Sequence, residues 1–236
     1  INFKGEYFSV KGPLNIARSR QGQPVLIQAG ASVPGQRLAA RTAEAVFTHW
    51  NSIEESKRFY RKLKSQLQDF GRTEDELLIF HAISPIVAET EEIALEKHHE
   101  LLDLTDPYES LKFVSGYMGN VDFSKYSLDT PAKEVEFPEV NSIQSMFHEM
   151  KQVIEEEDLK VGDLYKRFFG PAKKDEFVGT PTQIADAMEK WFTERATDGF
   201  MIQFPILPRD LEDFVELVVP ILQERGLFRK DYTGDT

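Results

Sequence analysis

Short apolar runs alternate along the chain with longer segments in which apolar residues recur every three or four positions. Runs of the first kind predict buried strands, and segments of the second kind predict amphipathic helices. Four such strand–helix pairs follow one another, and this alternation predicts an α/β fold with a parallel sheet. The first run, residues 24–29, is continuously apolar and predicts a strand that is buried on both faces. The predicted strands are residues 24–29, 45–50, 77–84 and 199–204.

The predicted helices carry capping signals at their ends. The clearest helix follows Ser52, which has Glu55 at capping-box spacing, and Gly71 ends it. Another begins at Thr180, which is followed directly by proline, the usual order at a helix start. The remaining predicted helices are residues 34–45, 89–104, 142–157 and 210–225.

Four consecutive strand–helix pairs fit either an open doubly wound sheet or half of a (β/α)₈ barrel. An open sheet usually carries a glycine-rich phosphate loop near its start, and neither common loop motif occurs in this chain. The predicted fold class is therefore α/β, with a slight preference for the barrel. Residues 106–176 interrupt the alternation, which indicates an insertion between two of the pairs.

The first predicted strand ends in the polar corner Gln28-Ala29-Gly30-Ala31-Ser32, directly before a predicted helix. Backbone N–H groups of the last three residues and the Ser32 hydroxyl could converge on an anion at the helix N-terminus. Ordinary capping of the helix by Ser32 explains the same residues equally well. The spacing alone therefore leaves a phosphate site and a simple turn as alternatives.

The histidines and aromatic residues give weaker evidence for a functional site. His49 ends the second predicted strand, at the end where this fold class places function, whereas His81 lies inside the third and is expected to be a buried, hydrogen-bonded core residue. His98 and His99 are expected to face solvent, and no cluster of carboxylates and histidines predicts a metal site. Two aromatic residues at strand ends are candidate pocket walls: Trp50 and Phe204.

Composition narrows the class of function. The chain has 236 residues, of which 41% are hydrophobic, so it can bury a sizeable core. A formal net charge of −12 disfavours a nucleic-acid partner, and no apolar run is long enough to predict a membrane span or a membrane partner. The absence of cysteine excludes disulfides and thiolate metal sites, and it fits a reducing cytoplasm.

Long motifs follow one another along nearly the whole chain. They are FKGEYFSVKGPLN, RSRQGQPVLIQAGAS, AARTAEAVFT, GNVDFSKYSLDTP, FVGTPTQIADAMEKWF and the stretch from DGFMIQF to the end. In order and length they resemble the FMN-dependent monooxygenases of the bacterial luciferase-like superfamily. The resemblance favours the branch of nitrilotriacetate monooxygenase component A, dibenzothiophene-sulfone monooxygenase and long-chain alkane monooxygenase.

This resemblance implies a (β/α)₈ barrel, of which residues 1–236 supply about the C-terminal half, with residues 106–176 as part of a family insertion. It implies a monooxygenase that takes reduced FMN from a separate flavin reductase and inserts one atom of O₂ into a small organic substrate. Catalytic residues are not assigned, because those of the family belong to its other half. Lys173 to Glu176 stand where many relatives have a Gly-His pair, so no role is carried over from that histidine.

The resemblance also implies that the polar corner holds the FMN phosphate. Ala31 and Ser32 are then the expected contacts, and Gln28, Ala29 and Gly30 shape the corner. A non-catalytic flavin- or phosphate-binding half-barrel and an inactive assembly partner are the alternatives to an enzyme.

The start of the chain carries a further expectation. It begins at Ile1 in a turn-like stretch without methionine, so we expect a chain whose front portion is missing, with a processed mature protein as the alternative. A half-barrel leaves two strand edges unpaired, and such edges promote association. The expected partner is therefore the missing N-terminal half or a second copy of the chain.

Overall fold

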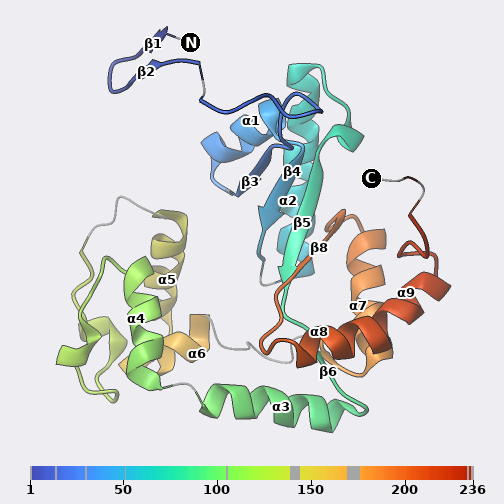
Figure 1. The fold of residues 1–236 in the computed structure, drawn as a ribbon. Helices are drawn as coiled ribbons and strands as arrows, with labels where there is room; N and C mark the ends of the chain where they lie inside the picture. The colour runs from blue at the N-terminus through green and yellow to red at the C-terminus, as the bar shows by residue number, and fades with distance from the viewer. Residues whose placement is uncertain are drawn as a thin grey trace.

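The computed structural model describes residues 2–13, 15–29, 31–50, 52–104, 106–138, 144–168, 176–232 and 234. Its centre is a parallel sheet in which neighbouring strands share one direction, so their carboxyl ends lie at one edge. The predicted α/β alternation is therefore confirmed (Figure 1). In spatial order the four strands are β3 (Ile27–Ala29), β4 (Ala45–Thr48), β5 (Leu78–Ile83) and β8 (Gly199–Ile202).

Helices cover one face of this sheet. Val46 and Ile79 are fully buried against α1 (Val33–Thr42) and α2 (Ile53–Gln66). Farther along β5, Ile83 packs into a second cluster with residues of α7 and of the C-terminal helix. Those elements are α7 (Pro181–Thr193), α8 (Arg209–Asp213), a π-helical turn (Phe214–Val218) and α9 (Val219–Glu224).

The opposite face of the sheet leaves large apolar side chains exposed. The strand register aligns Ile27 with Leu78 through β4, and it aligns Ala82 with Met201. Ile27 is 66%, Leu78 42% and Met201 47% exposed. The prediction that the first strand is buried on both faces is therefore wrong, because the described helices pack on only one side of the sheet. We call the opposite side the uncovered face.

Capping signals in the sequence located the helix ends well. Ser52 Oγ accepts a hydrogen bond from the Glu55 N–H at 3.3 Å, and α2 continues through a 3₁₀ turn to Gly71, whose φ of 69° ends it. Thr180 and Gln183 form a full capping box at the start of α7. The first strand begins later than predicted, at Ile27, because the Leu26 N–H donates to the Glu44 carboxylate instead of to a neighbouring strand.

A long excursion leaves the sheet after β5 and returns before α7. Its two ends meet in a short parallel pair, β6 (Ile86–Val87) with β7 (Val178–Gly179), and α3 (Glu91–Asp103) follows the outgoing end. Beyond α3 lies a helical unit with a hydrophobic core of its own, set apart from the sheet (Figure 1). Its helices are α4 (Pro107–Tyr117), α5 (Gln144–Glu156) and α6 (Leu164–Phe168).

The first described residues, where the sequence predicts only a turn-like stretch, form an antiparallel hairpin. Its strands are β1 (Asn2–Lys4) and β2 (Ser9–Lys11), and all their residues are exposed. The hairpin projects from the body of the molecule near the N-terminus (Figure 1). Within the described residues, no helix combines the length and the apolar character needed to cross a lipid bilayer.

Candidate functional site

The polar corner lies where β3 ends and α1 begins. Gln28 and Ala29 are the last residues of β3, whereas Ala31 and Ser32 lead into α1 and Gly30 lies outside the described residues. Since the sheet is parallel, the carboxyl ends of the other three strands lie at the same edge. In barrels of parallel strands this edge carries the binding and catalytic residues.

Ser32 is the N-cap of α1. Its Oγ accepts a hydrogen bond from the Gly35 N–H at 3.3 Å, and its backbone is extended, with φ of −63° and ψ of 155°. The capping interpretation is therefore confirmed. This bond uses the hydroxyl oxygen as an acceptor, so the hydroxyl proton can still be donated. The Ser32 side chain can thus cap the helix and donate a hydrogen bond to an anion at the same time.

The N-terminus of α1 is electrostatically suited to an anion. Its first turn contains no acidic residue, so no carboxylate opposes the partial positive charge of the helix end. Pro34 has no N–H and the Gly35 N–H donates to Ser32, which leaves the Val33 N–H without an intrahelical acceptor. The helix end thus adds a backbone donor to the hydroxyl of Ser32.

Gln28 brings a buried acceptor to the same corner. Its Nε2 donates to the Gly35 carbonyl at 3.1 Å, while its Oε1 is buried and receives no hydrogen bond from the described part of the protein. A buried acceptor that lacks a donor costs about 1–3 kcal/mol. The side chain of Gln28 holds the start of α1 against the end of β3 from the helix side, through its bond to Gly35.

His81 belongs to the helix side of the sheet and not to the corner. It is buried, and its ring stacks on Trp191 of α7 with centroids 4.3 Å apart. Burial, with a smaller contribution from His49, lowers the pKa of His81 to about 3, so the ring is neutral at pH 7. The predicted core position is confirmed, although Nδ1 receives no partner within the described residues. His49 is exposed after β4, 5.9 Å from the His81 ring.

The two aromatic residues predicted as pocket walls lie elsewhere. Trp50 packs on Phe59 of α2 with ring centroids 5.1 Å apart, and Phe204 packs on Phe214 at 5.8 Å. Both are partly buried against the clusters between sheet and helices. The reason is strand periodicity, because Trp50 has the same parity as Val46, which faces the helices. They are therefore part of the core.

Aromatic residues of the uncovered face are the ones that the sequence analysis missed. Register aligns Ala29, Phe47, Phe80 and Gly199 in one row across the four strands. A side chain at Gly199 would approach the Phe80 ring to 2.9 Å, so this ring lies directly over the glycine. Residues 77–80 are all apolar, so the sequence carries no alternation that could have identified this face.

The other candidates for chemistry add no second site. Within the described residues, histidine, aspartate and glutamate side chains form no group of three or more that could hold a metal. His99 is exposed as predicted, and His98 is partly buried. Residues 173–176 stand where many relatives have a Gly-His pair, and the structure describes only Glu176 among them. Glu176 Oε1 accepts a hydrogen bond from Trp191 Nε1 at 2.6 Å.

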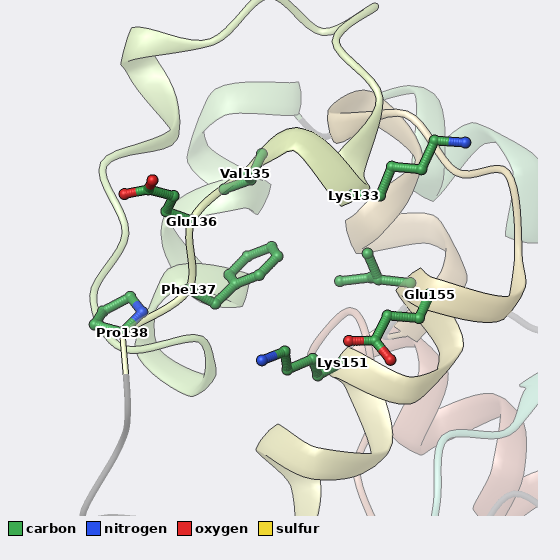
Figure 2. Close-up of a pocket in the computed structure, with 8 residues that line it drawn as sticks. Lys133, Val135, Glu136, Phe137, Pro138, Lys151 and Glu155 are labelled. Atoms are coloured by element: carbon green, nitrogen blue, oxygen red, sulfur yellow. The ribbon is translucent and has the colours of Figure 1, made fainter.

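A surface hollow of about 520 Å³ lies in the helical unit, between α5 and the segment before it. Figure 2 shows lysine and glutamate side chains around it, with the ring of Phe137 between them. The mixture of both charges favours neither an anion nor a cation. Its lining residues are Lys133, Val135, Glu136, Phe137, Pro138, Lys151, Ile154 and Glu155.

Comparison with known proteins identifies the family to which the sequence is similar. The family model described as luciferase-like monooxygenase matches residues 1–198. N-acetyl-S-(2-succino)cysteine monooxygenase of Bacillus subtilis (strain 168) is 46% identical over the whole chain, which covers 54% of that relative. Nitrilotriacetate monooxygenase component A of Aminobacter aminovorans is 41% identical, again over the whole chain and over 52% of its own length. The chain thus spans about half the length of the curated relatives it matches.

A solved structure agrees with these relatives. Riboflavin lyase, solved with modified FMN and riboflavin, superposes with a TM-score of 0.77 at 31% identity. The alignment covers the whole of this chain and 51% of that one. Together the comparisons confirm the resemblance inferred from the motifs, the branch that it favours and the barrel-type α/β fold class, of which this chain forms about half.

Proposed function

The chain belongs to the luciferase-like monooxygenase family, and from this premise we propose that it is part of an FMN-dependent monooxygenase. The enzyme would insert one atom of O₂ into a small organic substrate in the cytoplasm, with reduced FMN from a separate flavin reductase. In this proposal β3, β4, β5 and β8 are strands five to eight of the barrel, residues 1–236 belong to one barrel domain, and residues 106–176 are its insertion. The observation that carries the proposal is the polar corner at the carboxyl end of β3.

The corner fits the phosphate of FMN. Ser32 would donate its hydroxyl proton to a phosphate oxygen while it continues to cap α1. The backbone at Ala31 and the free N–H of the first turn would add donors, in the manner of anion sites at helix N-termini. The small side chains of Ala29 and Ala31, together with Gly30, would leave room for the phosphate to approach the backbone.

The uncovered face fits another part of the cofactor. Gln28 would shape the corner from the helix side, where its Nε2 donates to the Gly35 carbonyl. When bound, reduced FMN would supply the electrons for the reaction with O₂. The apolar side chains of the uncovered face, among them Phe80 and Met201, would keep water away from the reaction.

The Ser32→Ala variant tests the phosphate assignment. Loss of one hydrogen bond to a charged group is expected to weaken FMN binding by about 1–2 kcal/mol. Riboflavin, which lacks the phosphate, is expected to bind equally to both proteins. Flavin fluorescence titrations of the two proteins with each ligand measure this difference.

A matched control is available at the N-cap of α2. Ser52 accepts from the Glu55 N–H at 3.3 Å, the same geometry as Ser32 in α1. Ser52→Ala should therefore lose a similar capping free energy, about 1 kcal/mol, without any change in FMN affinity. Equal FMN affinities for wild type and Ser32→Ala would rule out the assigned role of Ser32.

The uncovered face is the surface that we propose for assembly. The edge strands β3 and β8 each have one strand neighbour in the described sheet, and Ile27 and Met201 expose apolar surface beside them. We expect this chain to associate with the remaining half of the barrel or, without it, with itself. Sedimentation velocity over a range of concentrations measures this, and a monomer that melts in one cooperative transition would contradict it.

A further inference from the structure

A buried glutamine holds the backbone of the corner from the helix side. Gln36 of α1 is only 5% exposed. Its Nε2 donates to the Ala31 carbonyl at 2.5 Å, and its backbone N–H donates to the Ser32 carbonyl at 2.8 Å. Two consecutive carbonyls of the corner are therefore fixed by one residue.

The orientation of the Gln36 amide is set by a second glutamine. Gln66 at the end of α2 donates from Nε2 to Gln36 Oε1 in a long hydrogen bond of 3.4 Å, and the same Nε2 donates to the Lys62 carbonyl at 3.1 Å. With its oxygen turned to Gln66, Gln36 presents its amino group to Ala31. The conformation of the corner is thus connected to the packing of α1 on α2.

This contact has a geometric consequence for the side of the corner that faces a ligand. In a planar trans peptide the C=O and the N–H point in opposite directions. Because the Ala31 carbonyl is drawn to Gln36, the N–H of Ser32 in the same peptide points away from the buried amide. The direction of this N–H is thereby fixed before any ligand binds.

We propose that Gln36 is a positioning residue for the flavin phosphate, an inference that rests on the proposed function. An apolar side chain would fill the same space without the cost of burying an amide. The amide instead satisfies its hydrogen bonds by fixing the Ala31–Ser32 peptide. Gln36 itself does not touch the phosphate but determines where the Ser32 N–H points.

The Gln36→Met variant tests the proposal, since it keeps the length of the side chain and removes the donor. FMN affinity is expected to fall about tenfold while riboflavin affinity stays unchanged, so the ratio of the two affinities reports on the phosphate alone. Gln183→Met is the matched control, because Gln183 is likewise an amide of a first helical turn, capping α7. It should lower stability and leave the ratio as in wild type.

Gln36→Leu is the second variant, in case Gln36→Met does not fold. Leucine is apolar and uncharged and cannot donate to the Ala31 carbonyl, so the same loss of FMN preference is expected. If the wild-type protein prefers FMN over riboflavin and the Gln36 variants keep that preference, the positioning role of Gln36 is overturned, but the phosphate corner is not. Wild-type protein that binds both flavins equally would overturn the phosphate corner itself, and the positioning role with it.

Discussion

Replacing Asp198 with alanine is expected to lower the free energy of unfolding by about 3–5 kcal/mol. Asp198 lies just before β8 and accepts hydrogen bonds from Tyr60 Oη at 2.7 Å and the Ile79 N–H at 2.8 Å. It also pairs with Lys64 Nζ at 2.9 Å, and the side chain of Lys64 is only 4% exposed. Without the carboxylate, the buried cation of Lys64 keeps two neutral carbonyls, those of Glu74 and Leu77, and the ring of Tyr60 as partners in the described structure, but no opposite charge.

Urea unfolding at pH 7 measures this effect. Glu194→Ala is the matched control, because it removes a carboxylate from a surface ion pair. Glu194 lies 2.7 Å from Lys57 Nζ, and the side chain of Glu194 is 40% exposed. An exposed pair of this kind contributes about 0–1 kcal/mol. Asp198→Asn, which keeps one acceptor oxygen, should give an intermediate loss. Equal losses for Asp198→Ala and Glu194→Ala would show that the buried network does not stabilise the sheet.

Acid is expected to destabilise the protein through His81. Its pKa lies near 3 in the folded protein because the ring is buried, against an ordinary value of 6.5. A lowered pKa means that the unfolded chain binds the proton more tightly, so the contribution is complete above pH 6.5 and is lost as the pH falls toward 3. Between pH 7.5 and 4.5 this amounts to roughly 3 kcal/mol at 1.36 kcal/mol per pKa unit.

The His81→Phe variant isolates this contribution. Phenylalanine keeps a ring to stack on Trp191 and removes the titrating group. The decrease in unfolding free energy between pH 7.5 and 4.5 should therefore be smaller than in wild type by roughly 3 kcal/mol. His99→Phe, at an exposed position of α3, should retain the wild-type decrease. Identical pH profiles for wild type and His81→Phe would contradict the neutral, buried state of His81.

The buried ion pair of Asp198 and the candidate site lie at opposite ends of the strands. Asp198 precedes β8 and Leu77 precedes β5, so the buried ion pair ties together the amino ends of these strands. The polar corner lies at the carboxyl end of β3. Parallel barrels divide stability and function in this way, so Asp198→Ala should change stability with little effect on flavin affinity.

Local signals explain which parts of the fold could be predicted. Ser52 and Thr180 cap helices because short polar side chains satisfy N–H groups that no earlier turn can reach, and Gly71 tolerates the positive φ that ends a helix. The Ser32 cap follows the same rule, so the helix start at the polar corner was visible in the sequence. The resemblance to the family then led to the proposal that this corner binds the phosphate of FMN.

Other features depend on contacts between distant residues. Helix α4 was missed, although Asp106 and Pro107 form a regular start, because its apolar residues pack on α5 and α6 and not on the sheet. The uncovered face was missed because an apolar strand looks the same whether one or both of its faces are covered. Gln36 gave no signal, since only the folded chain brings it to Ala31.

A crystal structure of the FMN complex of the protein that carries this sequence tests the central claim most directly. The account predicts the phosphate at the end of β3, with one oxygen within hydrogen-bond distance of Ser32 Oγ and another at the N–H groups of the α1 N-terminus. A phosphate bound elsewhere, with Ser32 still capping α1 and nothing beyond it, would contradict the account.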